Sequence, residues 1–190
     1  TPSKKAAAQP RQTGTMVSRQ EIVDDLSEYL NGLPIRTGGF REKALGIFKV
    51  KQAVVRTKKP LDMETIAHEV GHAIHKFIWG VTAKGNLNNK RLNPFRRELG
   101  PLDYDPKQSR VFEGFAEYVR LYMTNPAEAQ RRAPAFDAWF NSKLQTMPEL
   151  QAVMQKAQER FLGWEAQPAT AKIAASIKAK VREPKKWVSG

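Results

Sequence analysis

The stretch DMETIAHEVGHAIHKFIWG, residues 62–80, holds all three histidines of the chain and is predicted to form one helix. Asp62 is a favourable N-cap, and Leu61 and Ile66 occupy the two positions of a hydrophobic staple. Gly80 is suited to end the helix. Three histidines gathered on one well-capped helix are the main clue to the function of this protein.

His68 and His72 are four residues apart, so on a helix their imidazoles project from one face and can converge on one tetrahedral cation. Glu69 is turned by about 100° from that face and can reach a water on the cation. This HExxH spacing is typical of zinc hydrolases, in which the cation lowers the pKa of its bound water to about 7. The alternative is a solvated helix face that carries two histidines.

Two histidines leave one protein ligand to be found. Metzincins place a third histidine six positions after the second, but residue 78 is Ile78, which excludes that class. His75 is expected to support the site from its edge, because three ligands at this spacing on one helix would strain the geometry.

Two carboxylates are the remaining candidates for the third ligand. Glu113 and Glu117 lie one turn apart in SRVFEGFAEYVRLYM, residues 109–123, which is otherwise largely apolar. Two acids on a buried helix are costly unless a cation or a donor meets them. The alternative is a pair of surface ion pairs with Arg110 and Arg120.

HEVGH followed about forty residues later by EGFAEYVRLYM resembles the gluzincin metallopeptidases. The similarity covers roughly residues 45–145 and is greatest to the catalytic domain family of anthrax lethal factor and to zinc peptidase-like domains of phage and mobile-element polyproteins. It implies a zinc-dependent endopeptidase, of the kind that processes a phage-type polyprotein. The roles that it implies are zinc ligation by His68, His72 and Glu113, base catalysis by Glu69, support of a ligand by Glu117 and assistance to the oxyanion by Tyr104.

The expected fold class is α+β, a mostly helical minimal zincin with a small sheet packed on the HExxH helix. Residues 1–17 are interpreted as a flexible tail, 18–165 as the zincin-like domain and 166–190 as a basic C-terminal helix and tail. Gly114 fits a close approach of two helices. Further predictions are a helix over 18–31, one or two strands within 45–57, an irregular loop over 83–104, a helix over 106–124 capped by Asp105, and helices beginning at Pro126, Pro134 and Pro148.

The formal net charge is +13, and the basic residues are clustered. Residues 49–59 and 84–97 each carry five bases without an acid, and 172–190 carry six bases against one acid. Such clusters suggest a nucleic acid or an acidic partner, and three of them exceed what solubility requires. The rival functions are therefore a nucleic-acid-associated module with a structural or vestigial zinc, and a virion or secretion-system component whose peptidase acts once on its own polyprotein.

The composition excludes several other classes of protein. The chain has no cysteine, which excludes disulfide scaffolds and thiolate zinc sites, and no apolar run long enough to span a membrane. No signal peptide is visible, so we expect a soluble protein, with a cytoplasmic and a virion-associated location both left open. Trp79, Trp139 and Trp164 lie in helical apolar patterns and are expected to pack in the core rather than to stack on bases.

Overall fold

The computed structural model describes residues 63–173 without a gap, three short strands before them, and the helical positions Asp24 and Glu28. Residues 63–173 are 75% helical and contain no strand. The prediction of an α+β fold is therefore wrong for this continuous part, which has a mostly helical fold. The physical reason is that its apolar side chains recur at helical spacing and are buried by packing helix on helix. None of the helices described is both long and apolar enough to cross a bilayer.

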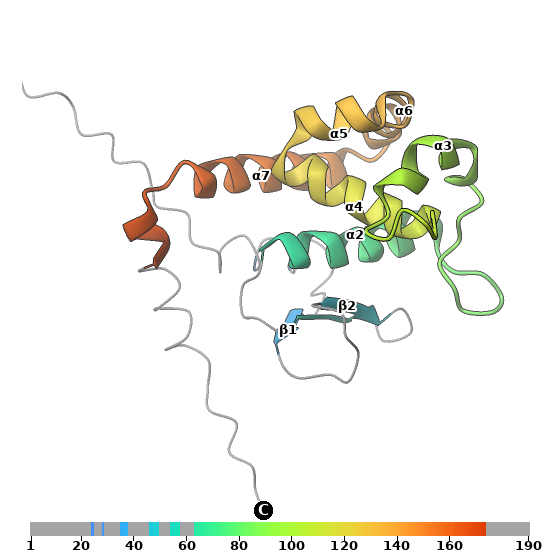
Figure 1. Cartoon of the computed structure of the whole chain (residues 1–190), viewed down its shortest axis with the longest axis horizontal. Helices are drawn as coiled ribbons and strands as arrows, with labels where there is room; N and C mark the ends of the chain where they lie inside the picture. Colours follow the sequence, from blue (N-terminus) through green and yellow to red (C-terminus); the bar gives the residue numbers. More distant parts are fainter. Residues whose placement is uncertain are drawn as a thin grey trace, which may run out of the picture.

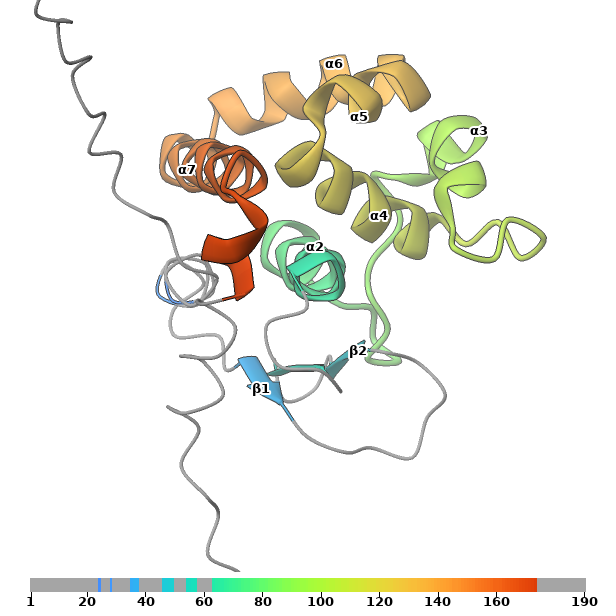
Figure 2. The ribbon, with the colours of Figure 1, turned by 60° about the vertical axis from the view of Figure 1, so that its left-hand side comes forward.

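Helix α4 lies at the centre of the fold. It contacts α2 on one side and α5 and α7 on others, and α6 packs in turn on α5 and α7 (Figures 1 and 2). Three short helices, η1, α3 and η2, lie within the segment 83–104 that was expected to be irregular. The bounds are α2 Met63–Trp79, η1 Asn93–Phe95, α3 Arg96–Leu99, η2 Gly100–Leu102, α4 Val111–Thr124, α5 Pro126–Arg132, α6 Pro134–Gln145 and α7 Pro148–Glu165.

Three strands of three or four residues precede α2. The middle strand, β3, pairs parallel to β1 and antiparallel to β2, with Val55 opposite both Ile35 and Phe48. Two of the strands fall within residues 45–57, where the sequence predicts strands. They are β1 (Ile35–Thr37), β2 (Gly46–Lys49) and β3 (Val54–Thr57).

Several expectations concern residues outside the described part of the chain. They include the tail over 1–17 and the basic segment from residue 174 onward. The capping residues Leu61 and Asp62 also lie outside it, as does the predicted helix over 18–31 except for its two helical positions named above.

Proline and asparagine set the starts of the later helices. Pro126, Pro134 and Pro148 are the first residues of α5, α6 and α7, as predicted, because a first-turn residue needs no backbone N–H. The side chain of Asn125 accepts a hydrogen bond from the Glu128 backbone N–H and so caps α5.

Helix α4 begins at Val111 and not at Pro106, so the predicted start is wrong by more than one turn. The buried carboxylate of Asp103 accepts a hydrogen bond from the backbone N–H of Arg110 at 2.9 Å and fixes the chain just before the helix. Ser109 has a positive φ of 50°, which a right-handed helix does not accommodate. The residues between Asp103 and Ser109 therefore form a turn and not the first turn of α4.

An aromatic cluster joins α4 to α6. Phe115, Tyr118, Phe136 and Phe140 are all fully buried, and their rings meet mostly edge to face. The three tryptophans named above all contact the core: Trp164 is buried, as predicted, while Trp79 and Trp139 are only partly buried and keep part of their surface open to solvent.

Helices α2 and α4 approach closely at Gly71, inside the HEVGH motif. A Cβ atom at this position would lie 2.7 Å from the Cα and 2.9 Å from the carbonyl oxygen of Ala116. The sequence suggested Gly114 for a helix contact; a Cβ there would collide with the carbonyl group of Leu99, so Gly114 admits the end of α3. Both glycines therefore set how closely α4 can be approached.

Replacing Gly71 by Ala is expected to destabilise the protein. The added methyl group gains about 1 kcal/mol of helix propensity, but overpacking against Ala116 backbone atoms costs up to about 3 kcal/mol. Thermal unfolding followed by circular dichroism should show a Tm below that of the wild type. Gly80→Asn is the control, because Gly80 has open space around it and asparagine tolerates its positive φ. A Gly71→Ala protein as stable as the wild type would contradict the tight contact.

Candidate metal centre

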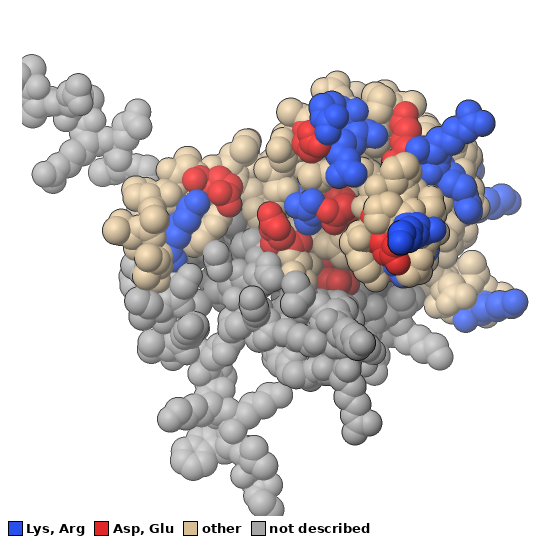
Figure 3. Space-filling view, in the orientation of Figure 1, with Lys and Arg blue, Asp and Glu red and all other residues tan. Residues whose placement is uncertain are grey.

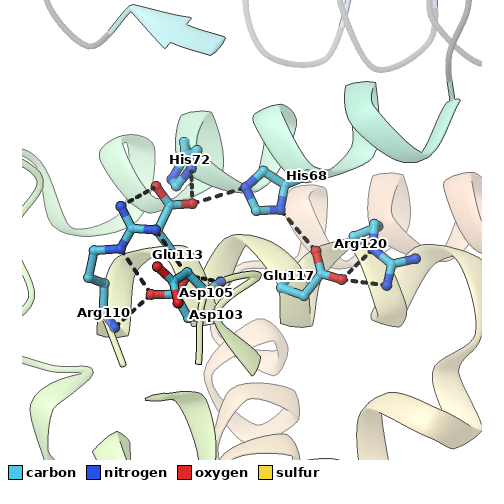
Figure 4. Close-up of polar contacts among 8 residues, drawn as sticks. All are labelled: His68, His72, Asp103, Asp105, Arg110, Glu113, Glu117 and Arg120. Atoms are coloured by element: carbon cyan, nitrogen blue, oxygen red, sulfur yellow. Dashed lines mark hydrogen bonds and ion pairs between the residues drawn. The ribbon is translucent and has the colours of Figure 1, made fainter. Parts of the chain in front are cut away.

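Three donor atoms from α2 and α4 meet where the two helices pack (Figure 4). The Oε2 atom of Glu113 lies 3.1 Å from Nε2 of His68 and 3.3 Å from Nε2 of His72. All three donors lie within 4.8 Å of one another. The structure thus brings together the two histidines and the first of the two candidate carboxylates.

The spacing of these donors fits a zinc ion. With metal–ligand bonds of about 2.0–2.1 Å, a tetrahedral site has ligand atoms about 3.3–3.4 Å apart. Two of the three separations here, 3.1 and 3.3 Å, are close to that value. Two imidazoles and one carboxylate are also the donor set of catalytic zinc sites, which leave a fourth position open.

His68 lies between two carboxylates. Its Nδ1–H donates to Oε2 of Glu117 at 3.0 Å, and its Nε2–H donates to Glu113 on the other side. Burial lowers the pKa of this imidazole, but the two hydrogen bonds and the nearby charge of Glu69 outweigh burial and raise the pKa to about 9. The site therefore stabilises a positive charge where a cation would bind.

Glu113 directs one oxygen to both histidines and Glu117 directs one to His68, and each acid turns its other oxygen toward an arginine. Arg120 donates from Nε to Oε1 of Glu117 at 2.7 Å, and Arg110 Nη1 lies 3.9 Å from Oε1 of Glu113. The sequence left two alternatives for these acids, a role at a metal site or ion pairs with Arg110 and Arg120. In the structure each acid contacts both a histidine and an arginine. Burial opposes ionisation of Glu117, but His68 and Arg120 lower its pKa to about 2.

A partly buried ion pair that sequence reasoning missed lies beside the site. Asp103 accepts hydrogen bonds from Nε and Nη2 of Arg110 at 2.9 and 3.0 Å, and the guanidinium lies 4.9 Å from the ring centre of Tyr104. Burial opposes ionisation of Asp103, but the bonds from Arg110 outweigh it and lower the pKa of the carboxyl. The sequence offered one signal for this pair: Asp103 is an acid beside the turn that precedes α4, the helix that carries Glu113.

This pair predicts a loss of stability in acid. Because the pKa of Asp103 is lower in the folded state, its contribution is present above the unfolded value of about 4 and is lost as the pH falls through the folded value. Asp103→Asn should therefore lower the free energy of unfolding by about 2 kcal/mol at neutral pH and by less in acid. Urea unfolding of both proteins at several pH values measures this. A difference that stays constant down to pH 3 would contradict the assignment.

Glu69 and His72 are both buried on α2, with 6% and 7% of their surfaces exposed. The negative charge of Glu69 is close enough to help raise the pKa of His68. Burial lowers the pKa of His72, although Glu113 acts in the opposite direction. Its Nδ1 atom has no hydrogen-bond partner among the described residues. Burial thus favours the neutral imidazole of His72, which is the form that ligates a metal.

The structure does not bring His75 to this cluster. Its Nε2–H donates to the backbone oxygen of Asn88 at 2.9 Å, and its ring packs against Trp79 and Phe115. The side chain is fully buried, and burial lowers its pKa to about 4. His75 therefore attaches the loop after α2 to the core.

Tyr104 lies at the outer edge of the site. Its ring centre is 6.3 Å from that of His68, and 68% of the residue is exposed. A group in this position can meet a ligand that approaches from solvent.

Comparisons of the chain with protein-family models, with curated proteins and with solved structures found no match.

Proposed function

We propose that this protein is a zinc-dependent peptidase of the gluzincin type, with zinc held by His68, His72 and Glu113. The observation that carries the proposal is the convergence of Nε2, Nε2 and Oε2 from these residues on one point between α2 and α4. The carboxylate of Glu117 behind His68 adds the outer support that ligating histidines commonly have.

The neighbouring residues prepare His68 as a ligand. A proton on Nδ1 is held by Glu117, which directs the lone pair of Nε2 toward the metal once the second proton leaves. Arg120 fixes Glu117 in turn. Metal binding at neutral pH is then accompanied by release of a proton, because His68 has a pKa of about 9 in the metal-free protein.

The chemistry divides between the ion and the chain. Zinc supplies a Lewis acid that polarises a carbonyl group and lowers the pKa of water. Glu69, buried next to His68, accepts the proton of the attacking water and later delivers it to the leaving amine. Tyr104, exposed at the edge, donates to the oxyanion that forms on the scissile carbonyl.

Metal analysis and peptide digestion test this proposal together. The purified full chain is expected to hold one zinc per molecule and to cleave members of a peptide library. Cleavage should stop on addition of a chelator and return when zinc is restored. A chain that binds zinc with full occupancy and cleaves no peptide or protein substrate would contradict the peptidase assignment.

A further inference from the structure

One end of the molecule carries positive charge that no described acid balances. Its five basic residues are all exposed, and within the described part of the chain none of them forms an ion pair. Figure 3 shows blue side chains gathered at this end, over α3 and the loop before it. We define the basic end by Lys84, Lys90, Arg91, Arg96 and Arg97.

Other arginines of the same fold are neutralised. Arg110, Arg120 and Arg131 each bind a carboxylate, the last through Glu128 at 2.8 Å. The acid within the α3 segment, Glu98, is directed elsewhere, because it accepts hydrogen bonds from the first backbone N–H groups of α6. The charge of the basic end is therefore available to a ligand.

A rigid frame holds these side chains in place. Leu92 and Leu99, which lie on either side of Arg96 and Arg97 in the chain, are fully buried. Gly114 of α4 admits the backbone of Leu99, and Gly100 admits the side chain of Ser109 at similarly close range. Arg96 and Arg97 thus project from a segment that is packed on α4.

Two residues of the basic end, Lys90 and Arg91, line a pocket with an aromatic wall. The pocket has a volume of about 510 Å³, within the range of ligand sites, and a second hollow of about 620 Å³ adjoins it at Lys90. Trp139 is partly buried, with its ring 5.0 Å from that of Phe95. The residues that line the pocket are Lys90, Arg91, Pro94, Phe95 and Trp139.

We propose that the basic end binds single-stranded nucleic acid, with phosphates on its lysines and arginines and a base against Trp139 and Phe95. Cations beside aromatic rings are the combination that holds single strands without sequence preference. A single strand offers free base faces for stacking on aromatic rings, whereas the bases of a duplex are already stacked on one another, so the aromatic wall favours a single strand. This surface is separate from the metal centre, because Trp79, which stacks on Trp139, lies about 10 Å along α2 from His72, the nearer of the two histidine ligands.

The charge contribution is tested by fluorescence anisotropy of a labelled oligothymidylate titrated with the full chain over a salt series. Lys90→Gln/Arg91→Gln should weaken binding and reduce the slope of log affinity against log salt by about 1.4. The control is Arg131→Gln/Arg132→Gln, which removes the same charge from two exposed residues of α5. Its slope should stay near that of the wild type, and equal effects of the two pairs would overturn the proposal.

The aromatic contribution is tested at Trp139. Trp139→Leu keeps an apolar side chain but removes stacking, and is expected to weaken oligothymidylate binding about 5- to 150-fold. Trp139→Phe should recover part of the loss, with circular dichroism verifying the fold of both variants. If Trp139→Leu does not fold, the charge pair alone decides.

Two further measurements separate this surface from its alternatives. Affinity should be the same with and without EDTA, whether or not the chain proves to be a peptidase. Loss of binding with EDTA would place the ligand at the metal centre and overturn the proposal. Polyglutamate that competes as well as unlabelled oligothymidylate would also overturn it, in favour of an acidic protein partner.

Discussion

Glu113→Ala is expected to lose zinc almost completely, whereas Glu117→Ala should lower zinc affinity only about 10- to 100-fold. The reason is geometric: Oε2 of Glu113 faces Nε2 of both His68 and His72, while Oε2 of Glu117 faces the outer nitrogen of His68 alone. Competitive titration with a zinc indicator at fixed pH measures both affinities.

Glu117→Gln serves as the matched control for this pair of variants. Its amide oxygen can still accept a hydrogen bond from His68 Nδ1–H, so its zinc affinity should lie between those of the wild type and Glu117→Ala. If Glu117→Ala lost the metal and Glu113→Ala kept it, the roles of the two acids would be reversed.

Glu69→Gln is expected to keep zinc at full stoichiometry while peptide hydrolysis falls about 10²- to 10⁴-fold. The side chain is adjacent to His68 in sequence but projects about 100° away from the ligand face, so its amide should leave the three donors in place. Zinc content and kcat/KM on the same preparation give the two readings.

Glu128→Gln provides the control, because it also removes one negative charge, from a partly exposed acid on α5 whose ion pair among the described residues is with Arg131. It should leave both zinc content and hydrolysis unchanged. Undiminished turnover in Glu69→Gln would remove this carboxylate from the proton transfer.

Local patterns in the chain predicted the features that depend on neighbours in sequence. A spacing of four residues places His68 and His72 on one helix face, and proline at a first helical position starts α5, α6 and α7. The same spacing rule places Glu113 and Glu117 on one face of α4. These features follow from backbone geometry within a few residues.

The same local reasoning failed where distant contacts compete with it. Asp105 and Pro106 form a good local start signal, yet α4 begins at Val111 because the buried carboxylate of Asp103 binds Arg110. The α+β class was wrong for residues 63–173, since the burial of apolar faces between helices forms that part of the fold.

The sequence by itself determined which side chains can ligate a metal, because helical periodicity fixes the face on which each one projects. Only the tertiary structure decided how the two helices meet: Gly71 lets α4 approach, and the resulting register sets Glu113 between both histidines and Glu117 behind one of them. It also directed His75 away from the cluster, to the backbone of Asn88. The physical reason is that spacing along a chain specifies a face but not its partner, which is selected by close packing between segments distant in sequence.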